Sequence, residues 1–185
     1  MPKFQSDREI ARDALEAPAF ANYGSNDIID DVQGDHSQDA DGLPPTYHYG
    51  IYGRIIEARR VLLVRKTRGP YKGLLDVPGG TPQSGESRHE TLSRELREEV
   101  GSEIASRSSW HSCAFSVEYS SEGDPRQFHH DAHWAEVTLV SPPDLHYFSD
   151  DTGGAQWFDL DGGNLSELSA LAKSILSMPA CANNP

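Results

Sequence analysis

The chain has 185 residues, and its 16 Lys and Arg against 29 Asp and Glu give a formal net charge of −13 at pH 7. This length predicts one domain of ordinary size plus an extension, and it excludes a large multidomain assembly. The negative charge argues against a nucleic-acid polymer as partner, because a sequence-independent grip on phosphates needs a net basic surface. An acidic protein that handles phosphates must therefore bring in metal cations.

Membrane and secretory signals are also absent from the sequence. No stretch approaches the roughly 18 apolar residues that span a bilayer, and the N-terminus MPKFQSDREIARD holds no apolar run of the secretory kind. We therefore expect a soluble, cytoplasmic protein without a membrane partner. Cys113 and Cys181 lie far apart and predict two free thiols rather than a disulfide.

Residues 1–45 predict an acidic N-terminal extension made of a short helix and a flexible linker. The segment holds ten acidic residues against three basic ones, and 24–42 contain six Asp with no Lys or Arg. Such a composition cannot bury enough apolar surface to offset its ordering entropy. Apolar residues at i, i+4 and i+7 within 4–20 predict the helix. Docking of this helix on the domain, or on a second subunit in a homodimer, is compatible with the pattern.

The folded domain is predicted over residues 46–178, with a C-terminal tail at 179–185. Alternating or continuous runs of β-branched, aromatic and aliphatic residues predict its strands. Gly and Pro predict a turn at 78–80, and apolar residues sharing one face predict a last helix over 165–176. The predicted strands lie at 47–56, 60–66, 111–120, 132–140 and 156–158, and a short apolar run lies at 74–75.

Residues 87–100 carry the strongest helix pattern in the chain. Ser87 and Glu90 form a capping box, apolar residues recur every four positions, and Gly101 stands where a helix-ending glycine belongs. Near the end of this helix, three glutamates at i, i+3 and i+4 fall within a sector of roughly 100°. Each like-charge pair costs a few tenths of a kcal/mol, so a cation should offset them.

Two sources of that positive charge are open. Arg94 and Arg97 could form ordinary surface ion pairs with the glutamates, as on any Glu-rich solvated helix face. The alternative is a bound metal ion, and the residues that precede the helix favour it. From Gly80 the chain reads GTPQSGESRHETLSRELREEVGS. This segment matches G-x5-E-x7-R-E-U-x-E-E-x-G-U, where U is aliphatic, at every position but the last.

That pattern is the signature box of the Nudix hydrolases, which the chain resembles from about residue 47 to 177. The one departure is Ser102 at the final aliphatic position, and we expect Ile104 to take its packing role. The fixed positions of the box are Gly80, Glu86, Arg94, Glu95, Leu96, Glu98, Glu99 and Gly101.

The chemistry of the pattern can be stated without the family. Hydrolysing a diphosphate requires screening the charge on its oxygens and generating hydroxide near neutral pH, and Mg²⁺ or Mn²⁺ does both. These hard ions prefer oxygen ligands. Several carboxylates on one face of a rigid helix, next to a glycine turn whose carbonyl can approach closely, suit that demand.

The resemblance implies an α/β fold, a Nudix-type α/β/α sandwich with a mixed, curved sheet. By resemblance, Glu98 and Glu99 would be metal ligands and Glu95 a ligand or the general base. Glu86 would add a looser contact to metal or water, and Gly80 would offer its carbonyl. Arg94 would orient a glutamate through an ion pair.

Family members also carry one more acid in the loop before the last strand. Asp150 and Asp151 occupy that place, with Asp151 the closer match. A turn-forming Asp beside Thr152 and two glycines is the competing interpretation. The sequence leaves these alternatives open.

The histidine-rich segment 129–133 is a further candidate for ligand binding. His129, Asp131 and His133 would share one face of a strand, as metal ligands must. The lack of a nearby Cys, and a box that already explains metal use, favour ordinary strand histidines that reach the substrate.

Substrate contacts are predicted from three residues outside the helix. Arg65 and Arg68 flank the expected site and would contact phosphate or base. Tyr119 stands about where family members acting on dinucleoside polyphosphates carry a tyrosine.

These observations together predict a Nudix pyrophosphohydrolase, dependent on Mg²⁺ or Mn²⁺, that cleaves a diphosphate bond. Its partner would be a small molecule, a nucleoside diphosphate linked to another moiety. One alternative is an isomerase of isoprenoid diphosphates, which the resemblance couples with a Cys near the site, and Cys113 lacks such a signature. The other is a nucleotide-binding sensor domain, a class that typically loses acids of the box.

Overall fold

The computed structural model describes residues 45–121, 124–148 and 151–179. The predicted N-terminal helix and linker, Asp150 and residues 180–185 of the predicted tail lie outside this part of the chain. Among the described residues, no helix is long and apolar enough to cross a membrane.

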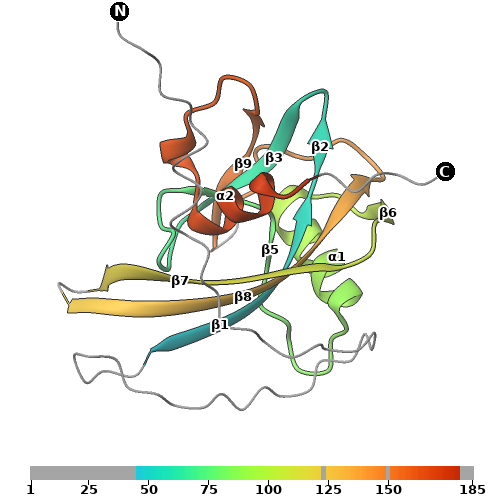
Figure 1. Ribbon diagram of the computed structural model, residues 1–185. Coiled ribbons are helices and arrows are strands. Elements are labelled where there is room, and N and C mark those ends of the chain that lie inside the picture. The colour runs from blue at the N-terminus through green and yellow to red at the C-terminus, as the bar shows by residue number, and fades with distance from the viewer. Residues whose placement is uncertain (1–44, 122–123, 149–150, 180–185) are drawn as a thin grey trace, which may run out of the picture.

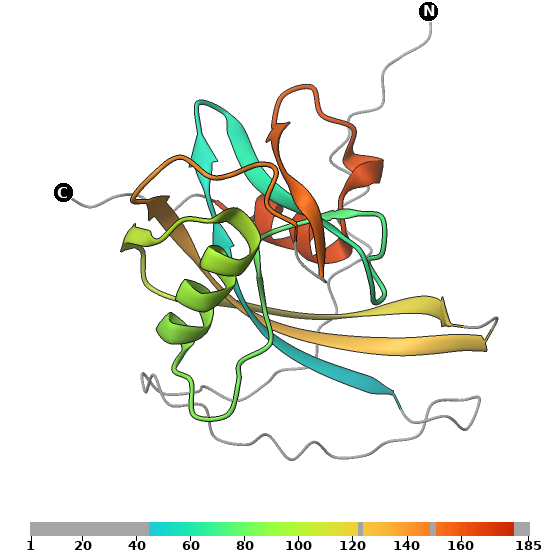
Figure 2. The same ribbon diagram turned by 180° about the vertical axis from the view of Figure 1, so that it is seen from behind.

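The described chain contains a five-stranded sheet, a four-stranded sheet and two α-helices, arranged as Figure 1 shows. Helix α2 lies in front of the strands in Figure 1, and α1 lies in front in the reverse view of Figure 2. The α/β/α arrangement predicted from the box is therefore confirmed. The elements are β1 (Thr46–Arg54), β2 (Ile56–Glu57), β3 (Arg60–Lys66), β4 (Leu75–Asp76), β5 (Gly79–Gly80), α1 (Arg88–Val100), β6 (Ile104–Arg107), β7 (His111–Ser121), β8 (Asp124–Leu139), β9 (Thr152–Asp159), a 3₁₀ turn (Leu165–Glu167) and α2 (Ala170–Ser177).

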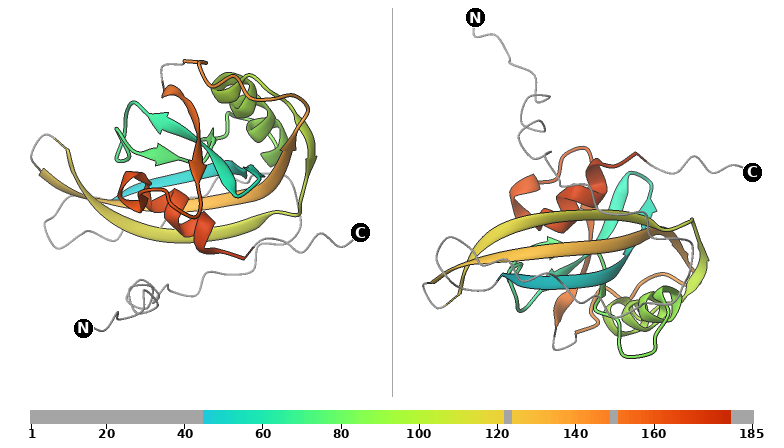
Figure 3. Two further views of the ribbon diagram at one scale, coloured as in Figure 1. Left: turned by 90° about the horizontal axis from the view of Figure 1, so that it is seen from above. Right: turned by 60° about the horizontal axis from the view of Figure 1, so that its bottom comes forward.

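The first sheet is mixed and strongly curved. Its order is β5-β1-β8-β6, and β7 also pairs with β8. Strand β8 runs parallel to β1 and antiparallel to β7 and β6. The long strands β1, β7 and β8 bend together beyond the helices (Figure 3). This sheet carries the predicted histidine run.

The second sheet positions the end of β3. Strand β3 pairs antiparallel with β2, β4 and β9, and its register with β9 shifts between Val64 and Lys66. Val64 packs in the core on the α1 side. Lys66 points the same way because side chains alternate along a strand, and Arg65 points to the opposite face.

Two apolar clusters hold the helices against the sheets. Fully burying one Leu or Ile side chain stabilises the fold by about 1.5–3 kcal/mol, so these clusters fix both helices. Buried residues of the α1 cluster include Ile51, Ile55, Leu62, Val64, Leu92, Leu96 and Val100. Buried residues of the α2 cluster include Trp134, Leu63, Leu75, Leu168, Leu171 and Ile175.

The turn predicted at 78–80 is wrong, because Gly79 and Gly80 form the short strand β5. They pair with Tyr52 and Ile51 of β1. Gly79 has φ 138°, and a Cβ there would lie 2.2 Å from the carbonyl oxygen of Ile51. Only glycine permits this backbone conformation and approach.

The continuous helix predicted over 165–176 is also wrong. It divides into the 3₁₀ turn and α2 because Ser169 caps α2, with its side chain accepting a hydrogen bond from the backbone of Ala172. Leu165 is consequently 64% exposed rather than on the buried face.

The predicted strands are present, but their bounds differ. The strand predicted over 47–56 divides into β1 and β2, and the strand predicted over 156–158 is the longer β9, which begins at Thr152. Strand β8 begins at Asp124, well before the predicted residue 132, because its first half pairs with β7. Strand β6 was not expected, since its four residues alternate neither in polarity nor in burial.

Candidate active site

Helix α1 is terminated at both ends as its sequence predicts. The side chain of Ser87 accepts from the backbone of Glu90, and the side chain of Glu90 accepts from the backbone of Ser87. Gly101 ends the helix in the left-handed conformation with φ 63°. These caps give the glutamates near the C-terminal end a rigid support.

Arg94 binds three of the four glutamates in the box. Its Nε lies 2.7 Å from Glu86 Oε1, and its Nη1 lies 2.8 Å from Glu95 Oε1 and 3.1 Å from Glu98 Oε2. Nη2 donates to the carbonyl oxygen of Thr81 at 3.1 Å. The planar guanidinium can serve several carboxylates at once because its donors form a fixed fork. Arg97 instead donates to the carbonyl of Ser93.

The surroundings give these glutamates different properties. Hydrogen bonds from Arg94 lower the pKa of Glu86 to about 2, so Glu86 is ionised at neutral pH. Burial raises the pKa of Glu95, although Arg94 opposes the shift. Glu98 is 53% exposed. Glu98 is thus the carboxylate of the group that is most open to solvent.

Glu99 points into the protein and is only 2% exposed. Its Oε2 accepts from the backbone N–H of Gly79 at 2.7 Å, and its Oε1 accepts from Lys66 Nζ at 3.3 Å. Burial raises the pKa of Glu99 to about 7 despite these partners.

Sequence reasoning missed Lys66, because contacts across the fold and not local spacing bring it to α1. Burial alone would lower the pKa of Lys66, but the charges of Glu99, Asp76 and Asp151 outweigh burial and raise it. The only sequence signal is the alternation of β3, which puts residue 66 on the same face as Val64.

Gly80 lies against the carboxylate of Glu95. A Cβ at position 80 would lie 2.6 Å from Glu95 Oε1, so any larger residue would displace that side chain. The backbone of β5 and the glutamates of α1 are thus brought together, as the resemblance implies.

A shallow pocket of about 740 Å³ lies between α1 and the loop that precedes it. It gives solvent access to the carboxylates of Glu86 and Glu98 and to Arg94. Its lining residues are Ser84, Gly85, Glu86, His89, Glu90, Ser93, Arg94, Arg97 and Glu98.

The donor set suits a hard divalent cation by chemistry and by charge. Among the described residues, the four carboxylates Glu86, Glu95, Glu98 and Glu99 form ion pairs with Arg94 and Lys66 alone, which leaves two negative charges in excess when all four are ionised. Oxygen donors of this kind are preferred by Mg²⁺ and Mn²⁺. In this conformation the two basic side chains engage the carboxylates, and within the described residues no three acidic, His or Cys side chains form a group that could hold a metal ion.

Asp151 and Arg68 lie at the end of β3, on the Lys66 side of the site. The two side chains form an ion pair, and the carbonyl oxygen of Asp151 accepts from Thr67 N at 3.1 Å. The charge of Asp151 also acts on Lys66. Asp150 lies outside the described residues.

The other predicted substrate residues are not in the glutamate cluster. Arg65 donates to the carbonyl of Gly73 and to Gln156. Tyr119 lies in β7, with its backbone opposite Arg126 of β8.

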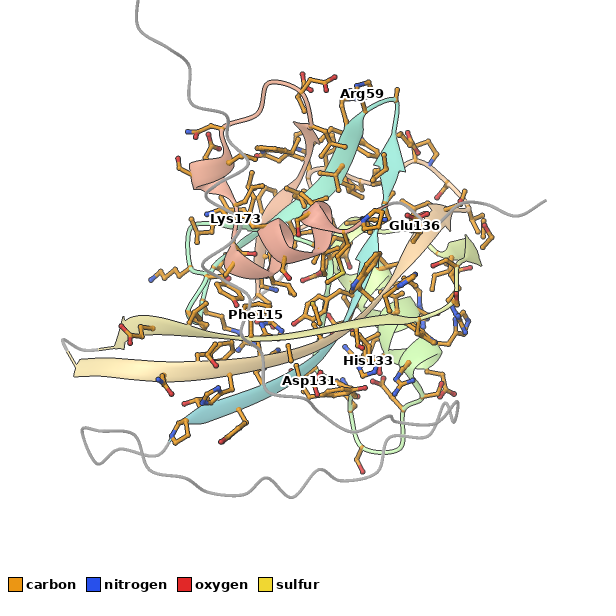
Figure 4. All side chains as sticks on the ribbon, viewed as in Figure 1. Arg59, Phe115, Asp131, His133, Glu136 and Lys173 are labelled. Carbon is orange, nitrogen blue, oxygen red and sulfur yellow. The ribbon has the colours of Figure 1, made fainter. Side chains whose placement is uncertain are left out.

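The histidine run follows the expected alternation of β8. His129 stacks on Tyr47 with ring centroids 4.9 Å apart, and the ring of His133 packs edgewise on Tyr49. Figure 4 shows Asp131 and His133 below the strand and Phe115 of β7 above it. No metal-binding group involving these residues is found in the part of the chain that the structure describes.

Cys113 packs against a different apolar cluster from the one that α1 packs against. It is half-buried on β7 and packs against the α2 cluster, whereas α1 packs against the other cluster. Among the described residues, then, no cysteine belongs to the glutamate site.

Comparisons with known proteins agree with this geometry. The family model described as the NUDIX domain matches residues 46–176. An ADP-ribose pyrophosphatase of Methanocaldococcus jannaschii is 35% identical over 51 residues, which are 28% of this chain and 30% of that protein.

A solved structure shares the fold at low identity. A MutT NUDIX hydrolase from Burkholderia pseudomallei is 20% identical, with a TM-score of 0.53 over 73% of this chain and 99% of that chain. A bifunctional NMN adenylyltransferase/ADP ribose pyrophosphatase from Francisella tularensis, complexed with AMP and a Mn ion, is 19% identical. Its TM-score is 0.49, over 71% of this chain and 40% of that chain. Because the family model covers most of the chain, and the box residues gather at one end of α1, the chain belongs to the Nudix family.

Proposed function

We propose that this chain is a divalent-metal-dependent pyrophosphohydrolase. Its substrate would be a nucleoside diphosphate linked to another moiety, cleaved at the diphosphate bond. The observation that carries the proposal is the cluster of four glutamates that share two basic partners, Arg94 and Lys66, in the described structure. ADP-ribose is the first substrate to test, since the M. jannaschii relative is named for it.

Glu95, Glu98, Glu99, the Gly80 carbonyl and, more loosely, Glu86 would hold Mg²⁺ or Mn²⁺. When bound, the ion screens the diphosphate charge and lowers the pKa of water. The chain itself supplies orientation, because Arg94 fixes the carboxylates of Glu86 and Glu95 and the Gly79 N–H fixes Glu99. Glu95 is suited to accept a proton, since burial raises the pKa of its carboxylate.

We propose that the substrate binds at the end of β3. Arg68 is 71% exposed there and can reach a phosphate. Asp151 would contribute either directly to the ion or through Lys66. Arg65 and Tyr119 stay predictions for contacts with the rest of the substrate, as does a homodimer.

Two alternatives make different predictions. A nucleotide sensor would bind without turnover, but the chain keeps every acid of the box. An isoprenoid-diphosphate isomerase would need a catalytic cysteine, and Cys113 packs in the α2 cluster instead.

The test is a hydrolysis assay with the purified full chain. ADP-ribose, nucleotide sugars, dinucleoside polyphosphates and nucleoside triphosphates would be offered, with released phosphate measured after phosphatase coupling. We expect turnover of at least one substrate, its loss in EDTA and its recovery with Mg²⁺ or Mn²⁺. Full turnover in chelator would contradict metal dependence, and tight nucleotide binding without any product would favour the sensor.

A further inference from the structure

Lys66 is a largely buried cation that forms an ion pair with Glu99 of α1. Its side chain is 18% exposed, and its Nζ lies 3.3 Å from Glu99 Oε1 of α1. Asp76 of β4 and Asp151, just before β9, also act on it by charge. A lysine so enclosed is not an ordinary surface residue, because burying its charge is costly unless it is paired.

Strand β3 brings Lys66 to this place. Val64 and Lys66 share the face that packs against α1, and β3 is held by partners on both edges. The direction of the Lys66 side chain is therefore set by the sheet, and not by α1.

The Glu99 carboxylate depends on Lys66 more than the other glutamates of the site depend on their basic partner, Arg94. Each of its oxygens has one hydrogen-bond partner in the described structure, Gly79 N for Oε2 and Lys66 Nζ for Oε1. Gly79 is fixed by its pairing in β5. Glu98 is half exposed and can turn to water, whereas Glu99 is 2% exposed and cannot. A buried carboxylate that loses one partner is free to rotate or must leave its site.

We propose that Lys66 is a positioning residue that holds the Glu99 carboxylate in its working orientation. The kinetic part of this inference rests on the proposed function, in which Glu99 binds the ion. Outer partners of metal ligands typically affect metal affinity or activity by about 10- to 100-fold. The effect passes through Glu99, so substrate binding changes little.

The experiment compares Lys66→Met and Lys66→Arg with Lys173→Met, a matched control on the exposed face of α2 (Figure 4). We expect Lys66→Met to lower kcat by about 10- to 100-fold with KM nearly unchanged. Lys66→Arg, which keeps a charged donor, should recover most of the rate, and Lys173→Met should behave as the natural chain.

A second readout needs neither substrate nor metal. Amide hydrogen exchange of Gly79, measured on the full metal-free chain, should become faster in Lys66→Met because Glu99 no longer holds that N–H. Lys66→Arg should restore the protection. Should Lys66→Met fail to fold, Lys66→Gln takes its place, since it keeps a hydrogen-bond donor on a shorter side chain and removes the charge.

Unchanged kcat and unchanged Gly79 exchange in Lys66→Met would overturn the proposal. Tighter Mn²⁺ binding with undiminished kcat would also overturn it, because Lys66 would then only compete with the cation. If the natural chain hydrolyses nothing but Gly79 exchange responds as expected, the proposed function fails and the positioning of Glu99 stands. If hydrolysis is metal-dependent and neither readout responds to the Lys66 variants, the proposed function stands and the positioning role of Lys66 fails.

Discussion

Two basic residues pair with the fixed glutamates of the box, and the exposure of their partners differs. On the surface side, Arg94 binds Glu86, Glu95 and the half-exposed Glu98. On the buried side, Lys66 pairs with Glu99, which is 2% exposed. The Arg94 and Lys66 side chains are themselves similarly exposed, at 16% and 18%, so the contrast lies in the carboxylates.

The difference shows in the charges that each group can keep. At the surface, hydrogen bonds from Arg94 lower the pKa of Glu86 to about 2. In the interior, burial raises the pKa of Glu99 to about 7 and that of Asp76 to about 6, although Lys66 opposes both shifts. At Glu86 the hydrogen bonds from Arg94 dominate, whereas at Glu99 and Asp76 burial outweighs the nearby cation.

Glu99→Gln neutralises the buried carboxylate and should have the largest effect on turnover. We expect kcat to fall by more than the roughly 100-fold that an outer partner costs, because a neutral amide loses the charge that would hold the metal. Glu98→Gln should also lower turnover by orders of magnitude. Steady-state kinetics measure both, and circular dichroism checks that the fold persists. Near-natural rates in both variants would count against the site.

Arg94→Lys breaks the surface side with the charge retained. An ammonium cannot replace the fork that joins three carboxylates, so we expect activity to fall by about 10- to 100-fold. Stability should fall by about 1–3 kcal/mol through the lost bonds to Glu86 and Glu95, since the half-exposed pair with Glu98 adds little. Thermal unfolding measures this loss, and an unchanged Tm would show that Arg94 does not organise the group.

Asp76→Asn tests the buried side through the pH dependence of the free energy of unfolding. Asp76 accepts hydrogen bonds from Ser169 Oγ at 2.7 Å and from its neighbour Val77 N at 2.9 Å, and Asn can accept both. Because burial raises the pKa of Asp76 from 3.8 to about 6, the folded state binds more protons than the unfolded state between these values. The contribution of Asp76 to the free energy of unfolding is therefore greatest below pH 4. It falls as pH rises to 6, by at most about 3 kcal/mol.

Urea unfolding of the metal-free chain at pH 4, 5, 6 and 7 measures that contribution. We expect Asp76→Asn to gain stability relative to the natural chain as pH rises from 4 to 6. A difference that stays constant over this range would mean that Asp76 has an ordinary pKa.

The surface side was easier to predict from the sequence than the buried side. The box places Glu86, Arg94, Glu95 and Glu98 at fixed offsets on one loop and one helix, and local geometry then decides their neighbours. The cap at Ser87 and the αL residue Gly101 were likewise predictable, since both depend on residues within the same helix.

The buried side depends on contacts between distant segments. Lys66 meets Glu99 only because β3 packs on α1, and Asp76 meets Ser169 only because β4 lies beside the start of α2. The last helix was predicted too long for the same reason, since Ser169 serves both as a cap and as a donor to Asp76. No spacing in the sequence contains these pairings.

Asp151→Asn should have the smallest effect, and it decides which side Asp151 serves. Asp151 is 39% exposed and paired with Arg68, so water screens part of its charge, and we expect kcat to fall several-fold with KM nearly unchanged. Action through Lys66, on which the charge of Asp151 acts, predicts no further loss when Asp151→Asn is added to Lys66→Met. Direct action on the ion predicts that the two losses multiply. Asp144→Asn is the matched control, because Asn keeps the acceptor for His146 N in the same loop. If Asp144→Asn slows hydrolysis as much as Asp151→Asn does, the loop acts through its conformation, and the carboxylate of Asp151 has no separate effect on turnover.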